Sequence, residues 1–129
     1  MQQFAAEEIG LASSLYQVFD KRYRDALAWQ PYAADGRQNV QIVKLYDERR
    51  EGFGPAAALL KYAPGASVPT HLHAGHELIL VLDGELIDDT GRHGPGTLEI
   101  CPPGSTHALA SETGCTFLVV WEQPVVRLA

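Results

Sequence analysis

Near the start of the chain, apolar residues recur every three or four positions, the spacing of one face of a helix. The positions that follow this spacing are Leu15, Val18, Phe19, Tyr23, Ala26 and Leu27. Ser14 and Gln17 have the spacing of a capping box, and Pro31 ends the pattern just beyond Gln30. We therefore expect one amphipathic helix within residues 1–30, packed on the rest of the protein or on a partner subunit.

After Pro31 the pattern changes to short runs of apolar and β-branched residues separated by Gly, Pro and Asp. The candidate strands are Val40–Leu45, Ala56–Tyr62, Glu77–Leu82, Leu86–Asp88, Thr97–Ile100, His107–Leu109 and Thr116–Trp121. The expected turns lie at Asp35-Gly36, Glu51-Gly52, Pro64-Gly65, Asp83-Gly84, Thr90-Gly91 and Pro103-Gly104. Many short strands with no helix between them predict an all-β fold, an antiparallel sandwich or barrel over residues 31–129.

The run Leu78–Leu82 is apolar at every position, so both faces of its strand need cover. One face must line the barrel interior. The other requires a second sheet, the N-terminal helix or another subunit, and we expect a homodimer on this ground.

Composition narrows the function classes. The 129 residues favour one domain, and a net charge of -6 argues against binding a phosphate backbone, so we expect no nucleic-acid partner. No apolar run approaches the roughly 20 residues that span a bilayer, and the first eight residues lack the pattern of a secretory signal. Cys101 and Cys115 are too few for a disulfide framework. We expect a cytoplasmic protein with no membrane partner.

Three of the five histidines stand between residues 71 and 76. Side chains two apart on a strand share a face, so His71 and His73 can converge on one ion. Glu77 keeps the same facing if the strand stays regular, and His107 can close the site from a later strand. Three imidazoles and one carboxylate suit Fe or Zn, with Mn or Ni as further choices, and match Ca or Mg poorly.

The other two histidines are not expected to bind the ion. His76 has the opposite parity to His71, His73 and Glu77, so it should point away from them. His93 lies in a run with Gly on either side, which we interpret as a solvated turn.

The residues around these histidines resemble both signature motifs of the cupin superfamily. The first motif runs through Gly65, His71, His73, Glu77 and Gly84, and the second through Gly96, Pro102, Gly104 and His107. At average usage the Gly-Pro-Gly spacing of the second motif alone arises about once per 4,000 positions. The resemblance implies a jelly-roll-like antiparallel barrel and a metal held by His71, His73, Glu77 and His107. One departure is Ser111, which stands where the family pattern has Asn, a turn residue rather than a ligand.

Within the superfamily the chain resembles the cupin domain of the ChrR anti-sigma factors and its stand-alone relatives. The similarity rests on phrases such as Trp29-Gln30-Pro31, Ala63-Pro64-Gly65-Ala66, Val81-Leu82-Asp83-Gly84-Glu85 and Pro102-Pro103-Gly104-Ser105-Thr106-His107. The same group includes cupins of the acetylacetone dioxygenase type, which use iron.

This resemblance leaves two functions open. The chain could be a dioxygenase of small dicarbonyl-like compounds, with Glu77 as a ligand or, if it swings free, as a catalytic base. It could instead be a sensing module that binds zinc and a small ligand without turnover. Residues 1–30 contain no His or Cys, so the zinc ligands of the anti-sigma domain that precedes the cupin in ChrR are absent here. A third class, the sugar-nucleotide epimerases of similar fold, works without metal, and the complete ligand set argues against it.

Overall fold

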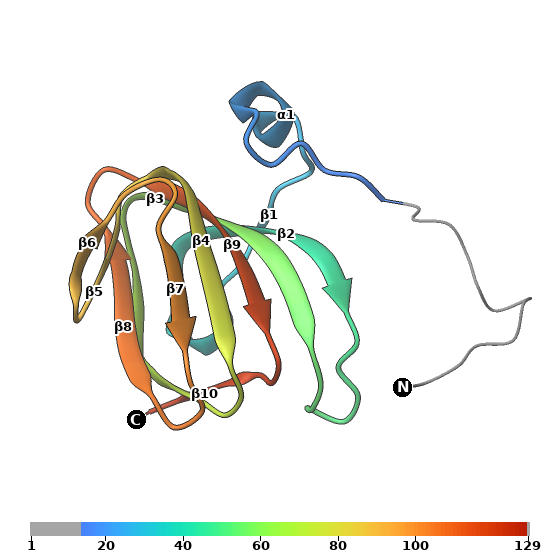
Figure 1. Ribbon diagram of the computed structural model, residues 1–129, viewed down its shortest axis with the longest axis vertical. Coiled ribbons are helices and arrows are strands. Elements are labelled where there is room, and N and C mark those ends of the chain that lie inside the picture. The colour runs from blue at the N-terminus through green and yellow to red at the C-terminus, as the bar shows by residue number, and fades with distance from the viewer. Residues whose placement is uncertain (1–13, 129) are drawn as a thin grey trace, which may run out of the picture.

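The computed structural model describes residues 14–128, and most of them lie in one curled antiparallel sheet (Figure 1). The helical elements are short: α1 (Lys21–Asp25) and a 3-10 turn, η2 (Ala34–Gly36). The strands are β1 (Gln30–Pro31), β2 (Gln38–Asp47), β3 (Ala56–His73), β4 (Glu77–Gly84), β5 (Leu86–Asp88), β6 (Gly91–His93), β7 (Leu98–Cys101), β8 (Thr106–Ser111), β9 (Cys115–Trp121) and β10 (Val125–Arg127). The predicted all-β, cupin-like barrel is confirmed.

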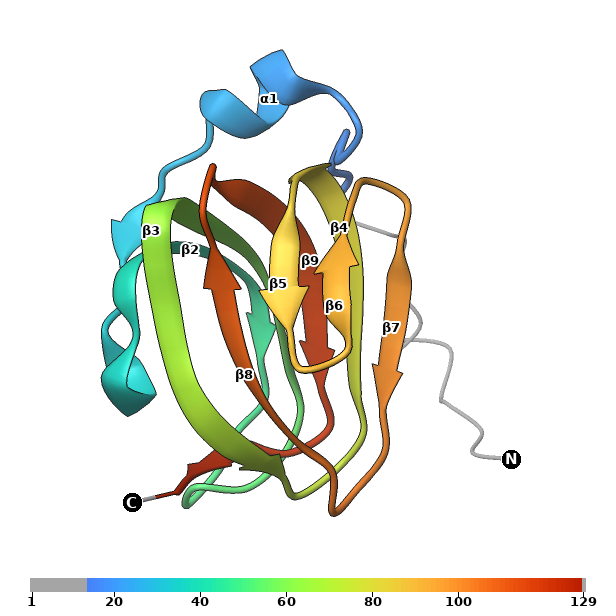
Figure 2. The same ribbon diagram turned by 90° about the vertical axis from the view of Figure 1, so that its left-hand side faces the viewer.

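Strand β3 joins the two walls of the barrel. Its first half, residues 56–62, pairs with β2 and β9, and its second half, residues 66–73, pairs with β8 and β10. The path continues on one side through β9 and β4 to β7, and on the other through β8 and β5 to β6. Figure 2 shows β3 curving from one wall into the other. The edge strands β6 and β7 are not paired with each other, which leaves a seam between the walls.

The core fills the space between the walls with alternate residues of the paired strands. Leu60 of β3 and Val81 of β4 both pair with Phe117 of β9, and all three side chains are buried. Tyr62 meets Phe117 edge-to-face, with ring centroids 5.1 Å apart. This apolar block supports one end of the barrel, and the polar site described below lies beyond it.

The N-terminal helix is much shorter than predicted. It covers Lys21–Asp25 rather than residues 14–30, and its N-cap is Asp20, whose carboxylate accepts from the backbone N–H groups of Arg22 and Tyr23. Leu15 and Phe19, two of the residues on the predicted apolar face, are exposed. Because nothing in residues 14–128 covers them, the periodic pattern has no surface to stabilise a longer helix. The predicted boundary between residues 1–30 and 31–129 stays a prediction.

Two predicted turns, Pro64-Gly65 and Asp83-Gly84, lie inside strands. Pro64-Gly65 lies inside β3, where the strand changes partner: Tyr62 is the last residue paired with β9 and Ala66 the first paired with β8. A proline without an N–H fits this unpaired bend. Gly84 does not turn a hairpin either, because β5 pairs with β6 and β8 and not with β4.

Strands β1, β6 and β10, of two or three residues each, were not predicted. Within residues 14–128, no helix is long and apolar enough to cross a membrane.

Candidate metal centre

The structure brings together the four residues that the sequence singled out. His71 and His73 lie on the second half of β3, Glu77 begins β4, and His107 lies on β8 directly opposite His71. One ligand atom from each residue lies within 4.8 Å of the others, and all four side chains are buried. The three imidazole rings are nearly perpendicular to one another, with centroids 4.4 to 5.1 Å apart.

The parity argument holds for the two histidines on β3 but not for Glu77. Strand β3 ends at His73, and residues 74–76 form a bend before β4 begins. Glu77 is the first residue of β4, where it pairs with Trp121 of β9 on one side and Cys101 of β7 on the other. This pairing, and not a continuation of β3, brings Glu77 to the site. The bend also takes His76 to the surface, where its Nδ1 lies 2.7 Å from Oε1 of Glu122.

The outward nitrogens of His71 and His73 have hydrogen-bond partners, so the inward nitrogens carry free lone pairs. His71 Nδ1 lies 3.1 Å from the carbonyl oxygen of Pro69, which can only accept. His73 Nδ1 lies 2.9 Å from Oγ of Ser105, whose own hydroxyl hydrogen is donated to the carbonyl of Pro102 over 2.6 Å. Both rings therefore hold their proton on Nδ1 and point Nε2 into the cluster. Metal-binding histidines have this arrangement.

His107 is oriented by acidic and thiol groups from β7. Its Nδ1 lies 3.6 Å from Oε1 of Glu99 and 3.9 Å from Sγ of Cys101, and its Nε2 lies 3.1 Å from Nε2 of His73. Burial alone would lower the pKa of His107, but Cys101, Glu77 and Glu99 raise it to about 11. An ion that binds at Nε2 must displace any proton held there.

Trp121 fixes the carboxylate of Glu77. Its indole N–H donates to Oε1 over 2.8 Å, which directs Oε2 toward His73 and His107. Burial opposes ionisation, but the imidazoles of His107 and His73 outweigh it and lower the pKa of Glu77 to about 2. The carboxylate is therefore charged at neutral pH.

The donor set fits a transition-metal ion. Nε2 of His71 and Oε2 of Glu77 are buried and receive no aligned hydrogen bond, although buried polar atoms are nearly always satisfied. Burial and the neighbouring His107 also lower the pKa of His71 to about 4, so its ring stays neutral and able to bind metal. Three inward imidazole nitrogens and one carboxylate oxygen around one point suit a divalent ion such as Fe or Zn.

A cavity of about 160 Å³ reaches this cluster at the seam between the two walls. His73 and His107 line it, together with Glu99 and Cys101 of β7 and the turn that joins β5 to β6. The volume suits a small molecule.

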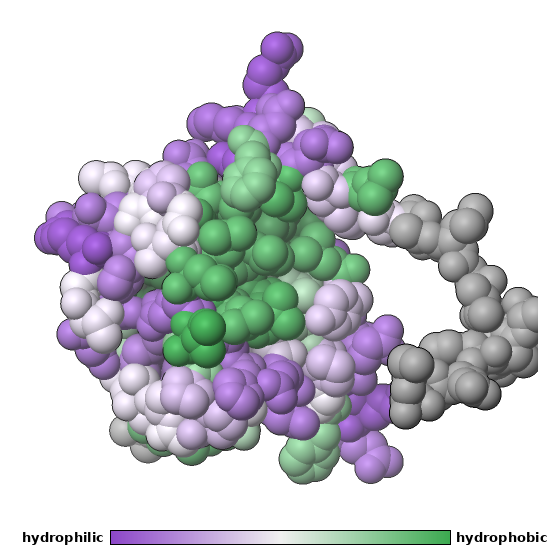
Figure 3. Space-filling view, in the orientation of Figure 1, coloured by the Kyte–Doolittle hydropathy of each residue, from purple (hydrophilic) through white to green (hydrophobic). Residues whose placement is uncertain are grey.

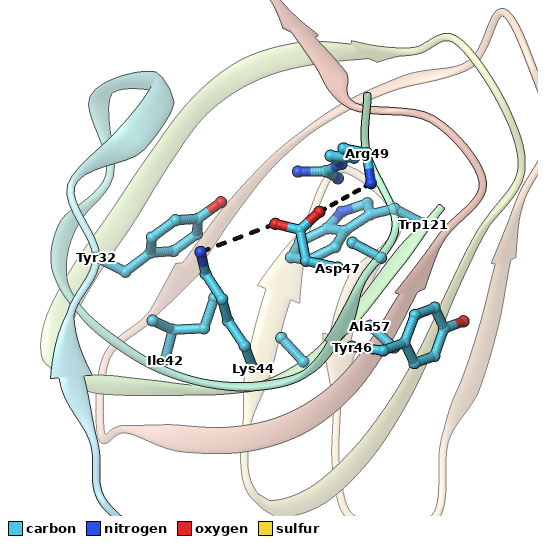
Figure 4. A pocket seen from close by; sticks show the side chains of 10 residues that line it. Tyr32, Ile42, Lys44, Tyr46, Asp47, Arg49, Ala57 and Trp121 are labelled. Carbon is cyan, nitrogen blue, oxygen red and sulfur yellow. Dashed lines mark hydrogen bonds and ion pairs between the residues drawn. The ribbon is translucent and has the colours of Figure 1, made fainter. Parts of the chain in front are cut away.

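A second, smaller pocket of about 50 Å³ borders Trp121 and contains none of the four candidate ligands (Figure 4). Within it Asp47 lies 3.8 Å from Nζ of Lys44 and accepts the backbone N–H of Arg49. This pocket is too small to hold a ligand of ordinary size.

Several residues of the site were missed from the sequence. Trp121, Ser105 and Glu99 orient the candidate ligands, but each is an ordinary strand or turn residue until the register is known. His93 was expected in a solvated turn and instead ends β6, with its Nε2 2.9 Å from Oδ1 of Asp88. Ser111 makes turn contacts of its own, since it donates to the carbonyl of Glu85 and accepts the N–H of Gly114.

Comparison with known proteins assigns the family. The sequence model of the protein family described as the ChrR cupin-like domain matches residues 23–125, which include the whole barrel up to the start of β10. The chain belongs to the ChrR cupin-like family. It is 40% identical over 75 residues to the anti-sigma-E factor ChrR of Cereibacter sphaeroides. The match covers 56% of the chain and only 35% of that protein.

Solved structures of cupin fold are similar to this ChrR cupin-like chain at low identity. The acetylacetone dioxygenase of Acinetobacter johnsonii superposes with a TM-score of 0.73 at 11% identity, covering 99% of this chain and 85% of that one. The Rhodobacter sphaeroides complex of SigE with the anti-sigma factor ChrR gives 0.63 at 23% identity, covering 90% and 72%. These likenesses establish the fold.

Proposed function

We propose that the chain binds one divalent transition-metal ion through His71, His73, Glu77 and His107, and that it is a dioxygenase of small dicarbonyl-like compounds. The observation that supports catalysis is the cavity that opens onto His73 and His107. A purely structural ion is enclosed by its ligands, whereas a catalytic ion keeps a position open to substrate.

The residues of the site have separate tasks in this proposal. His71, His73 and His107 bind through Nε2, because Pro69, Ser105 and the Glu99–Cys101 pair occupy the Nδ1 side. When bound, the ion supplies Lewis-acid polarisation of substrate oxygen atoms and, if it is iron, the capacity for one-electron chemistry with oxygen.

Glu77 is either the fourth ligand or the base. As a base, Oε2 accepts the proton from the carbon between two carbonyl groups, while Oε1 stays bonded to the Trp121 indole. The four ligands are buried, so water is excluded from the rest of their surroundings and the proton transfer takes place in a sheltered site.

The decisive experiment combines metal analysis with oxygen uptake. Protein purified without added metal is analysed for bound elements, then loaded anaerobically with Fe²⁺ and assayed for oxygen consumption with small diketones. We expect oxygen uptake that His107→Ala abolishes, while the surface variant His76→Ala behaves as wild type. Full zinc occupancy with no oxygen uptake in any metal form would exclude the dioxygenase. Full metal content in His71→Ala, Glu77→Ala and His107→Ala would exclude the site itself.

One observation favours a second function, a sensing module that binds zinc and a small ligand. The curated relative with 40% identity is an anti-sigma factor rather than an enzyme. In that case metal binding stabilises the barrel and a small ligand changes its stability, with no turnover. Thermal unfolding of the zinc-loaded protein distinguishes the two, because a ligand that binds without being consumed raises the Tm persistently.

We further propose a homodimer in the cytoplasm. Figure 3 shows an apolar area over β4, β7 and β9, and the exposed side chains there include Leu78, Leu98 and Ile100. A contiguous apolar area on a sheet face is typical of a subunit interface. Sedimentation should show a dimer that Ile100→Lys dissociates, and a wild-type monomer at all concentrations would contradict it.

The two cysteines support the proposed cytoplasmic location. Both are buried and free, as expected of thiols in a reducing compartment.

A further inference from the structure

A second group of potential ligands lies beside the candidate metal centre and shares none of its four residues. Asp88 ends β5, His93 ends β6 and Glu99 lies on β7. Each offers one ligand atom, and these atoms lie within 4.8 Å of one another. Together they bridge the seam between the two walls of the barrel.

The carboxylate of Asp88 is buried with one oxygen unsatisfied. Its side chain is 1% exposed. Oδ1 accepts from the backbone N–H and the hydroxyl of Thr90, over 2.8 and 2.6 Å, and lies 2.9 Å from Nε2 of His93. Oδ2 is buried and has no donor. A carboxylate oxygen withdrawn from water without a partner is costly, so it requires a positively charged or proton-bearing neighbour.

Glu99 of β7, on the other side of the seam, also has a buried carboxylate oxygen without a hydrogen-bond donor. Its Oε1 lies 3.6 Å from Nδ1 of His107, while Oε2 is buried without a partner. One carboxylate oxygen of Glu99 and one of Asp88 lie within 4.8 Å of each other. Two ionised carboxylates have no proton to share. A proton or a cation is therefore needed beside their two unpartnered oxygens.

A cation fits the surroundings better than a proton does, because the cluster offers ligand atoms besides its two carboxylates. His93 adds an imidazole nitrogen and Thr90 a hydroxyl oxygen, 3.0 Å apart. Two carboxylates with an imidazole form a ligand set for Zn or Mn. Asp88, Thr90 and Glu99 all line the cavity at the seam, which gives an ion a route to the cluster.

We propose that Asp88, His93 and Glu99 form a second divalent-cation site. Glu99 would then link the two centres, with Oε1 toward His107 and Oε2 on the second ion. The second site does not depend on the proposed function of the first.

The test counts Zn²⁺ equivalents on the full, metal-free chain by competition with a chromophoric chelator. We expect two equivalents on the wild type and one on Asp88→Asn and on His93→Gln, which remove one ligand each and keep similar shapes. His71→Ala should lose the first site and retain the second. The matched control is His76→Asn, which removes a surface His–Glu pair and should leave two equivalents.

A single equivalent on the wild type would overturn the proposal and assign a shared proton to the Asp88–Glu99 pair. Two equivalents that survive both Asp88→Asn and His93→Gln would also overturn it, since the second ion then binds elsewhere. If Asp88→Asn does not fold, His93→Gln decides the question, because its side chain is 21% exposed and it is not part of the core.

Discussion

Trp121 donates its indole N–H to Oε1 of Glu77 over 2.8 Å, and the two residues are also direct partners across strands β9 and β4. The strand register therefore places the donor, and the donor then orients the carboxylate. Because Oε1 is occupied, only Oε2 is free to face His73 and His107. The candidate centre thus depends on a residue 44 positions away in the chain.

Trp121→Phe should weaken metal binding by about 10- to 100-fold, the usual effect of removing a partner that orients a ligand. The phenyl ring preserves most of the packing, so the fold should remain. Chelator competition measures the affinity. Trp29→Phe is the matched control, because its indole donates to the backbone of Arg24, near the helix. Equal affinities for both variants would show that Glu77 needs no such orientation.

Ser105→Ala should also weaken metal binding, by about 10-fold. The Ser105 hydroxyl accepts the Nδ1 proton of His73, and without it the imidazole can turn or change tautomer. Ser67→Ala removes an exposed hydroxyl from the same strand as His73 and should have no effect. The comparison is made by titrating Zn²⁺ into each metal-free protein. A loss of affinity in Ser67→Ala as large as that in Ser105→Ala would contradict the assigned role.

How much of the site the sequence could predict depends on how local each contact is. The shared face of His71 and His73 follows from strand geometry alone, and motif spacing identified His107. Glu77 was grouped with the two histidines by strand parity, which fails at the bend of residues 74–76, although the first motif also includes it. Trp121 and Ser105 contact their partners through strand pairing and loop geometry, and no local pattern marks them. His93 was placed in a turn because β6 has only three residues, of which the first is Gly91, and Gly94 follows them. Short strands are specified by their neighbours rather than by their own composition.

Gly84→Ala should destabilise the barrel far more than Gly104→Ala. Both glycines have positive φ, +75° and +88°, which costs an alanine about 1–2 kcal/mol. A Cβ on Gly84 would also lie 2.1 Å from the carbonyl oxygen of Gly114, whereas a Cβ on Gly104 meets nothing within 4 Å. Urea unfolding should give a loss of about 4 kcal/mol or more for the first variant, since strands β4 and β9 would have to separate. Similar losses of stability in both variants would mean that the positive φ, and not the contact with Gly114, determines the cost of the alanine.

Alkaline pH should destabilise the protein through Cys115. Burial raises the pKa of this thiol to about 12, whereas in an unfolded chain it is about 8.5. Between these values the unfolded state binds fewer protons than the folded state, so the free energy of unfolding falls as the pH rises, by up to about 1.4 kcal/mol per pH unit. The stabilisation from the Cys115 thiol is fully present below the pKa of the unfolded chain. It is lost progressively as the pH rises toward the pKa of the folded protein.

Cys115→Ala should therefore flatten the decline in stability above about pH 9. Urea unfolding at a series of pH values, with reductant present, measures the slope. Val119→Ala provides the control, because it removes a buried side chain from the same strand without removing a titrating group. It should lower stability by the same amount at every pH. A slope for Cys115→Ala that parallels wild type would assign the alkaline decline to other buried groups, of which Tyr62 is the first to test because burial raises its pKa as well.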